Sequence, residues 1–397
     1  MKKLLIVSYF FPPFNNIASR RWAEMIPRLE RDFDVYVYTF NSTGDLKVPI
    51  QEAKIKRFGF LSNVRFNHEQ RRKNFFTTIV SQFTRNLRTL DSTFRTFYLK
   101  GRKSYFSLLR EIKPDIVLTT AGPFSALFFG YESKIRNRNI LWVIDFRDSM
   151  SLYTRSSKNF VKRKIDSFID KKVTSKADLI LSVSNTLSEI LGNFYERIVY
   201  TIHNGFEKRN HQFTDKVPND AIKIYYAGQI YPHQEPSLTL LLGHLEYNNN
   251  YELQVRLLGD SNRVMEIKNL VQGFQNAKVF ILNPAERKTV DLEKSSADYL
   301  LILEDLFISN QVSKGTLTGK LFEYLPYKSP ILAICRPDSE IKNILKITGR
   351  GDVVSSISGL ENFFELKKNF KSTKKVDDFS REAQAERFIK ILNQKMH

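Results

Sequence analysis

Short runs of apolar residues alternate along the chain with stretches in which apolar residues recur at helical spacing. In the first half, the apolar runs predict buried β-strands at residues 3–9, 34–39, 115–120, 140–145 and 178–183. These runs are continuously apolar, which is typical of parallel strands covered on both faces. The stretches between them predict helices, for example over residues 18–30, in which one face would carry Trp22, Met25, Ile26 and Leu29.

The same alternation starts again in the second half, after a polar stretch. There the apolar runs predict strands at residues 222–228, 253–259, 277–282, 298–303 and 329–334. We therefore expect an α/β protein with two doubly wound, Rossmann-like domains that face each other across a cleft. The predicted boundaries are residues 1–207 for the amino-terminal domain, 208–220 for the linker, 221–378 for the carboxy-terminal domain and 379–397 for a last helix. That helix could pack on either domain, including back on the amino-terminal one.

The net charge changes the picture, because 62 Lys and Arg against 42 Asp and Glu give +20. Such a charge favours anionic partners. Basic and aromatic residues are interleaved most densely in residues 65–110, where a predicted helix would carry Phe75, Phe76, Ile79, Val80, Phe83 and Leu87 on one side and Arg72, Arg85 and Arg88 on others. This basic amphipathic pattern suits an anionic membrane surface. The alternative is that the apolar residues pack on the domain and the basic residues are solvated.

Several functional classes find no support in the sequence. No apolar stretch approaches the roughly 18 residues of a spanning helix, and the apolar start stops at Pro12 and Pro13 without a small-residue cleavage site. The only cysteine, Cys335, allows no internal disulfide. The six histidines show no metal-ligand spacing, and no Asp-x-Asp pair suited to holding a divalent ion with a diphosphate is present. We expect a cytoplasmic protein whose chemistry needs no metal.

The predicted cleft is where functional residues should lie, because ligands of open α/β sheets bind at the carboxyl ends of the strands. Three segments fall at such strand-to-helix junctions: residues 11–21, 145–150 and 227–234. A fourth candidate is residues 314–334, where a Gly- and Thr-rich loop and a short amphipathic stretch lead into a buried strand. Their shared position at strand ends predicts a common site.

Motifs in these segments carry a resemblance to a known family. They include the aromatic-Pro-Pro loop at Phe11 with Arg21 downstream, the HNGF turn, the Y-x-G element of Tyr226 and Gly228, the RLLGD and SSADYLLIL runs, and TGKLFEYL followed by SPILAI. Their order and spacing, along nearly the whole chain, resemble the GT-B fold retaining glycosyltransferases of family 4, the type that includes many bacterial surface-polysaccharide enzymes.

The TGKLFEYL motif supplies the first donor-binding candidates. If Thr318 caps a helix, Gly319 and Lys320 lie in its first turn, where free N–H groups and an ammonium favour the phosphates of a nucleotide-sugar. Glu323 would share a face with Lys320, and the resemblance implies that it binds the ribose hydroxyls. The spacing alone favours the alternative that Lys320 and Glu323 form an exposed ion pair.

The chain departs from the family pattern at several positions. A second glutamate expected eight positions before Glu323 is Gly315 here, and Glu304 or Asp305 could substitute for it at the donor sugar. The usual glycines of the first loop are replaced by residues that include Asn16, which tolerates φ > 0 and could still bring backbone N–H groups to phosphate. Where relatives carry an Arg and a Lys after the Y-x-G element, this chain has Gln229, His233 and Gln234.

Catalytic candidates lie at a strand end in the first half, where Asp145, Arg147 and Asp148 form a polar cluster. Asp148 corresponds best to an aspartate that touches the sugar in the family. The alternative is that Arg147 makes a salt bridge that ties down a loop. In the resembled group the leaving phosphate is thought to take the proton of the acceptor hydroxyl, which agrees with the lack of an evident strong base.

The resemblance implies a metal-independent, retaining, hexosyl-type glycosyltransferase that needs no cofactor. It would move a sugar from a UDP- or GDP-sugar to a lipid-linked or oligosaccharide acceptor in surface polysaccharide biosynthesis, while peripherally associated with the inner face of the cell membrane. Two alternatives remain open. A catalytically silent GT-B scaffold would bind nucleotide without transfer, and a nucleic-acid-binding protein would explain the charge but not the cleft motifs. The sequence does not indicate the oligomeric state.

Overall fold

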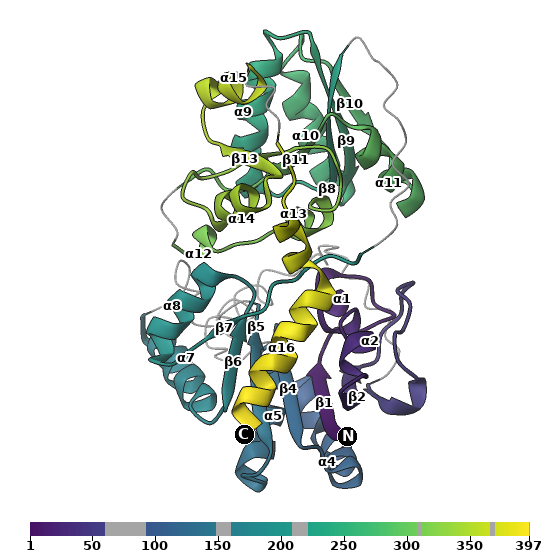
Figure 1. The fold of residues 1–397 in the computed structure, drawn as a ribbon, viewed down its shortest axis with the longest axis vertical. Coiled ribbons are helices and arrows are strands. Elements are labelled where there is room, and N and C mark those ends of the chain that lie inside the picture. The colour runs from purple at the N-terminus through teal and green to yellow at the C-terminus, as the bar shows by residue number, and fades with distance from the viewer. Residues whose placement is uncertain (60–92, 148–159, 209–220, 308–310, 366–369, 397) are drawn as a thin grey trace, which may run out of the picture. The chain divides into compact units, whose positions relative to one another are not determined.

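The computed structural model describes residues 1–59, 93–147, 160–208, 221–307, 311–365 and 370–396. The chain divides into two compact units (Figure 1). Unit 1 comprises Met1–Asn204 and Arg381–His397, and unit 2 comprises Gly205–Ser380. Each unit is built on one parallel sheet with helices packed on both of its faces. The predicted fold class of two doubly wound α/β domains is therefore confirmed.

The sheet of unit 1 has seven strands in the order β3-β2-β1-β4-β5-β6-β7. Their bounds are β1 (Lys2–Ser8), β2 (Phe33–Phe40), β3 (Ile55–Phe58), β4 (Ile116–Ala121), β5 (Leu141–Phe146), β6 (Leu179–Ser182) and β7 (Tyr200–Thr201). The five strands predicted in this half are present within one or two residues of their expected ends. The two edge strands were not predicted, because β3 carries two basic residues in four and β7 is only two residues long.

Helices cover both faces of this sheet. They are α1 (Ile17–Ala23), α2 (Ile26–Leu29), α4 (Lys100–Ile112), α5 (Ser125–Arg136), α7 (Phe160–Thr174), α8 (Asn185–Tyr195) and α16 (Arg381–Met396). A 3₁₀ turn at Glu52–Lys54 precedes β3, and a π-helical turn at Phe94–Leu99 leads into α4. On one face α1, α2 and α16 share a core with the strands, in which the rings of Trp22 and Phe388 meet 4.9 Å apart. On the other face, Tyr38 of β2 packs edge-on against Tyr105 of α4 and Phe129 of α5.

The first helix differs from the prediction. Residues 18–30 do not form one helix, because α1 ends at Ala23 and α2 starts at Ile26 with Pro27 in its first turn. Proline lacks the N–H that an α-helix would use at this position, and its ring clashes with the carbonyl oxygen four residues earlier. The predicted apolar side chains Trp22, Met25, Ile26 and Leu29 are nevertheless buried together.

Unit 2 contains a six-stranded sheet in the order β10-β9-β8-β11-β12-β13. Its strands are β8 (Ile222–Gln229), β9 (Tyr251–Leu258), β10 (Val279–Leu282), β11 (Tyr299–Leu303), β12 (Ile331–Ile334) and β13 (Gly351–Val354). Its helices are α9 (Glu235–Leu245), α10 (Ser261–Gln272), α11 (Arg287–Ser296), α12 (Gln311–Lys314), α13 (Gly319–Tyr324), α14 (Glu340–Thr348) and α15 (Ile357–Glu365), with 3₁₀ turns at Pro232–Gln234 and Lys374–Phe379. All five strands predicted in this half are present, and β13, which begins with Gly and Asp, was missed.

The two faces of this second sheet are packed by different helices. One face joins the strands to α9, α10 and α15 through residues such as Leu241, Ile267 and Phe364. The other face joins them to α13 and α14 through residues such as Leu321 and Ile344. Leu321, Phe322 and Tyr324 hold α13 in this core, so its remaining residues are presented at the end of the sheet.

The change of unit falls at Asn204–Gly205, where Gly205 has φ +66°. Most of the predicted linker, residues 209–220, lies outside the described residues, and so does most of the basic amphipathic segment, whose described part is residues 93–110. The last helix, α16, belongs to unit 1, where it contacts α2. None of the helices in the described ranges is both long enough and apolar enough to cross a bilayer.

Candidate functional site

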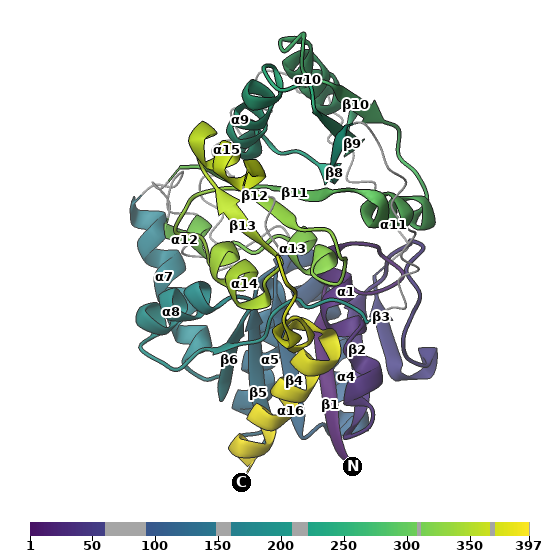
Figure 2. The ribbon, with the colours of Figure 1, turned by 45° about the horizontal axis from the view of Figure 1, so that its top comes forward.

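The centre of the site is the point in the second sheet where the chain reverses its direction of winding. From β8 the chain proceeds to β9 and β10 on one side, and later from β11 to β12 and β13 on the other (Figures 1 and 2). The crevice at the carboxyl ends of β8 and β11 is therefore the switch point, where open α/β sheets bind ligands. Gly228 and Gln229 end β8, and Glu304 directly follows β11.

Gly228 makes room for the side chain of Lys320. Its φ of +132° is a conformation that a residue with a Cβ rarely adopts, and a Cβ at this position would lie 2.9 Å from both Cε and Nζ of Lys320. The ammonium of Lys320 lies 4.8 Å from the ring centroid of Tyr226, two residues earlier on β8. The Y-x-G element and the TGKLFEYL motif, almost a hundred residues apart, thus meet at one point.

Lys320 is a cation without a fixed counter-charge. Burial lowers its pKa, as does the positive charge of Lys294, while the negative charges of Glu304 and Glu323 partly oppose that shift. Within the part of the chain that the structure describes, its ammonium forms no ion pair and no hydrogen bond. A half-buried ammonium that lacks a protein anion is favourably placed to accept an anionic ligand.

Glu323 does not pair with Lys320, so the alternative of an exposed ion pair between them is wrong. One carboxylate oxygen of Glu323 lies 3.6 Å from the ammonium of Lys294 on α11, which also lies 3.5 Å from a carboxylate oxygen of Asp291. Lys294 is buried beside the rings of Tyr324 and Tyr327. Glu323 itself is 47% exposed. Its carboxylate is held in place on one side and remains accessible on the other.

Glu304 interacts with two of the polar residues that follow β8. Gln234 donates a hydrogen bond from Nε2 to Oε1 of Glu304 over 3.4 Å, and Nε2 of His233 lies 3.7 Å from Oε2. Glu304 raises the pKa of His233 above its ordinary value of 6.5, Asp305 adds to that effect, and Arg263 opposes it. The acid that could substitute for the missing family glutamate therefore lies beside His233 and acts electrostatically on Lys320.

This contact predicts a pH dependence. Below its raised pKa, His233 adds a positive charge next to the crevice, so binding of a nucleotide-sugar should strengthen as the pH falls through that pKa, on the alkaline side of 6.5. His233→Gln should remove this dependence. Isothermal titration with an intact nucleotide-sugar is the suitable measurement, because its diphosphate does not titrate near neutral pH. An identical pH profile in wild type and variant would exclude His233 from the site.

Helix α13 begins where the sequence predicted. Thr318 occupies the N-cap position and Gly319 is the first helical residue, although the Thr318 side chain makes no capping hydrogen bond. The helix is only six residues long, so its dipole adds little to the charge of Lys320. Gly315 is buried and brings no carboxylate to the site. The acids whose charges act on Lys320 are Glu304 and Glu323.

In unit 1, Asp145 has a structural role. Both of its carboxylate oxygens accept hydrogen bonds from Arg21, over 2.9 and 2.7 Å, and one also accepts a hydrogen bond from Nε1 of Trp22 over 2.7 Å. Asp145 and Arg21 are both fully buried, and Arg21 also donates to the backbone oxygen of Ile202. We therefore do not retain Asp145 as a catalytic residue, because its oxygens are already occupied.

The other predicted site residues of unit 1 differ in their surroundings. Arg147 donates a hydrogen bond to the backbone oxygen of Gly122 over 2.9 Å, and Gly122, with φ +111°, leaves room for the guanidinium. Asp148 lies outside the described residues. Asn16 has extended backbone (φ −146°) and caps α1 by accepting a hydrogen bond from the backbone N–H of Ser19, so its side-chain oxygen is engaged there.

One Asp-x-Asp sequence does occur, at Asp32 and Asp34, where β2 begins. Asp32 pairs with Arg28, and Asp34 lies 2.9 Å from the ammonium of Lys54, which lowers the pKa of Asp34. The pair lies at the amino end of its strand, opposite to the edge where ligands bind in such sheets. Among the described residues, no group of three or more His, Cys, Asp or Glu side chains could hold a metal ion.

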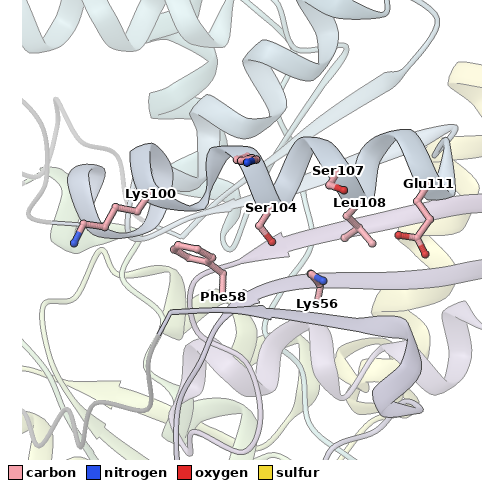
Figure 3. Close-up of a pocket in the computed structure, with 8 residues that line it drawn as sticks. Lys56, Phe58, Lys100, Ser104, Ser107, Leu108 and Glu111 are labelled. Atoms are coloured by element: carbon pink, nitrogen blue, oxygen red, sulfur yellow. The ribbon is translucent and has the colours of Figure 1, made fainter.

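An open groove of about 410 Å³ lies elsewhere in unit 1, between β3 and α4. Figure 3 shows Lys56 and Phe58 of β3 on one wall and Ser104, Ser107 and Leu108 of α4 on the other. It contains none of the residues predicted as site residues, and its lysines are exposed. We assign it no role.

Some residues around the crevice were missed by the sequence reasoning. Lys294, which fixes Glu323, lies on α11 and outside any motif. Tyr226 contributes its ring under Lys320 and donates a hydrogen bond from its hydroxyl to the backbone oxygen of Gln229 over 2.7 Å. Only the position of Tyr226 in the Y-x-G element could have marked it.

Comparisons with known proteins support the fold. Searches against protein-family models and against curated proteins found no match. A sucrose-phosphate synthase from Thermosynechococcus elongatus is similar over 99% of each chain, with a TM-score of 0.67 and 13% identity. An Anabaena protein solved with UDP and glucose is similar over 99% of this chain and 100% of its own, with a TM-score of 0.63 and 12% identity.

A third similar structure is described with a different activity from that of the first. It is a Listeria monocytogenes protein described as a UDP-N-acetylglucosamine 2-epimerase, with a TM-score of 0.55, 10% identity, and coverage of 99% of this chain and 96% of its own. The two parallel-sheet units and these similarities define a GT-B fold. At such identities the likeness shows the fold alone, and the reaction must be inferred from the site.

Proposed function

We propose that the protein is a glycosyltransferase that moves a sugar from a nucleotide-sugar donor to a hydroxyl acceptor. The observation that carries this proposal is the meeting of Gly228, Lys320 and Glu304 at the switch point of the second sheet. An ammonium without an ion-pair partner among the described residues, a glycine that leaves space beside it, and a carboxylate nearby form a site with groups for both parts of such a donor. The anionic diphosphate would bind at Lys320, and the neutral, hydroxyl-rich sugar would lie toward Glu304.

Sugar transfer requires stabilisation of the negative charge that develops on the leaving group. The bond between the anomeric carbon and a diphosphate oxygen breaks, and a new bond forms between that carbon and the acceptor oxygen. Negative charge grows on the diphosphate, where the Lys320 ammonium would stabilise it. The acceptor proton would pass to a leaving phosphate oxygen, which fits a retaining mechanism in which Asp145 takes no part. Arg147 and Asp148 remain the catalytic candidates within unit 1.

The details of substrate and location extend the proposal. UDP- or GDP-sugars as donors, a lipid-linked or oligosaccharide acceptor, and a role in surface polysaccharide synthesis follow from the family resemblance of the motifs. The sequence pattern of residues 65–110 suggests peripheral association with the inner face of the membrane from the cytoplasm. Metal independence agrees with Lys320 as the cation for the diphosphate.

A panel of nucleotide-sugars tests the activity. The full chain should show a raised melting temperature with one nucleotide and its sugar conjugates, and should transfer the sugar from that donor to a lipid-linked acceptor or, more slowly, to water. Adding a chelator should leave transfer unchanged. Binding without transfer to any acceptor would favour the silent scaffold, and a lack of any binding would contradict the proposal.

Glu323→Ala should distinguish the contribution of the ribose to binding from that of the diphosphate. We expect affinity for the ribonucleotide to fall by at least about tenfold, since a hydrogen bond to a charged group typically contributes about 1.5–3 kcal/mol. Binding of the 2′-deoxy analogue should change little. Glu361→Ala, which removes an exposed carboxylate from α15, is the matched control. An equal loss for the ribo- and deoxyribonucleotide would argue against a ribose contact.

A further inference from the structure

Helix α7 presents a specific set of side chains to solvent. Its side chains are described from residue 164 onward, and the exposed ones are Lys164, Ile165, Phe168, Lys171 and Lys172. At about 100° per residue, these side chains fall within an arc of about 120° on the helix. Phe168 is 66% and Ile165 is 42% exposed. We call this arc the α7 outer face.

The acidic residues of the same stretch face inward. Asp166 and Asp170 are buried on the opposite side of the helix, together with Val173 and Thr174. The hydroxyl of Tyr195 on α8 donates a hydrogen bond to Oδ1 of Asp170 over 2.8 Å. A helix on the surface of a soluble domain ordinarily buries its apolar residues and exposes its charged ones of both signs. Here the acids are buried while a phenylalanine and an isoleucine are exposed among lysines.

Two lysines of this face, Lys171 and Lys172, contact aromatic rings. In the described parts of the chain neither Lys171 nor Lys172 forms an ion pair. The Lys171 ammonium lies 5.0 Å from the ring centroid of Phe194, and that of Lys172 lies 5.8 Å from the ring centroid of Phe168. The neighbouring helix α8 does expose an acid, Glu189, and its C-cap residue Glu196 is also exposed, so the positive face belongs to α7 itself.

We propose that the α7 outer face docks on the surface of an anionic lipid bilayer. Interfacial helices place aromatic and aliphatic side chains at the level of the headgroups, with lysines beside them. Phe168 lies inside the arc with lysines on both sides, and the lysine stems can lie along apolar surface while their ammonium groups contact lipid phosphates. A nucleic acid would use the lysines but would leave Ile165 without a role. The inference does not depend on the transferase activity, and it concerns a helix outside residues 65–110 of the sequence.

Vesicle sedimentation with the full chain tests this docking. The protein should bind vesicles of phosphatidylcholine mixed with phosphatidylglycerol and not vesicles of phosphatidylcholine alone. Replacing two lysines, in Lys171→Gln with Lys172→Gln, should weaken binding by about thirtyfold, and Phe168→Ser by at least about tenfold. The matched control is Lys342→Gln with Lys346→Gln, which removes the same charge from exposed positions on α14 in unit 2 and should change binding less than about twofold.

Any of the following three results would overturn the proposal. Unchanged binding of both α7 variants, with binding lost in Arg85→Gln with Arg88→Gln, would assign docking to residues 65–110. Equal losses in the α7 and α14 lysine variants would indicate attraction by net charge alone. Loss of oligonucleotide binding with retained vesicle binding would make the face a nucleic-acid surface. All substituted side chains of α7 and α14 are exposed, so melting temperatures should match wild type and confirm that the variants are folded.

Discussion

Replacing Lys320 with methionine should weaken the binding of a nucleoside diphosphate by tenfold to a hundredfold, about 1.5–3 kcal/mol. Lys320 is the cation at the switch point that has no protein counter-charge in the described structure, so its loss would remove the main attraction for the diphosphate. Methionine keeps the unbranched apolar stem against Tyr226. Isothermal titration of the pure nucleotide into wild type and variant measures the difference directly.

The same variant should be at least as stable as wild type without ligand. Burial lowers the pKa of Lys320, so the protonated side chain costs folding free energy below its folded pKa, and this cost disappears only above the unfolded pKa. Methionine removes the cost at neutral pH. Lys342→Met, at an exposed position of α14, controls for the loss of one charge. Weaker binding accompanied by a lower melting temperature would indicate a structural role for Lys320 and count against the proposal.

Asp145→Ala should destabilise unit 1 by about 3–5 kcal/mol, because it leaves the guanidinium of Arg21 buried without its counter-charge. The buried indole N–H of Trp22 would also lose its acceptor. Denaturant unfolding followed by tryptophan fluorescence is a suitable measurement, since both tryptophans, Trp22 and Trp142, lie in unit 1. Unit 2 should bind nucleotide as before in any folded fraction.

A double substitution distinguishes the ion pair from a catalytic role. Arg21→Met combined with Asp145→Leu should be less destabilised than the sum of the single variants, because no uncompensated charge remains. A stable Asp145→Ala protein that binds donor but has lost transfer would contradict the structural assignment. That result would restore the catalytic role predicted from sequence.

Much of the fold could be predicted because the buried parallel strands are continuously apolar. Runs such as those of β1 and β11 contain many adjacent apolar side chains. A strand can bury side chains on both of its sides only in a sheet that is covered on both faces. The edge strands escaped prediction because they are short and partly exposed, so burial does not shape their composition. The break between α1 and α2 escaped because the apolar spacing continues across Pro27 while the backbone hydrogen bonds cannot.

The site was predictable only where local sequence and position in the sheet coincide. Gly228, Lys320 and Glu304 were predicted as site residues because each follows or approaches a strand end, and the structure places them near one another. The buried pairing of Asp145 with Arg21 was not predicted, since the two residues lie 124 positions apart and no spacing rule links them. The pairing of Glu323 with Lys294 depends in the same way on two helices that meet only in the folded unit.

The central claim is that the crevice between the ends of β8 and β11 binds the diphosphate of an activated sugar. Hydrogen–deuterium exchange of the full chain, with and without a saturating nucleotide-sugar, tests it most directly because exchange is read segment by segment. We predict slower exchange in the backbone of residues 226–234 and 318–324. Slower exchange confined to unit 1, with these two segments unchanged, would contradict the account.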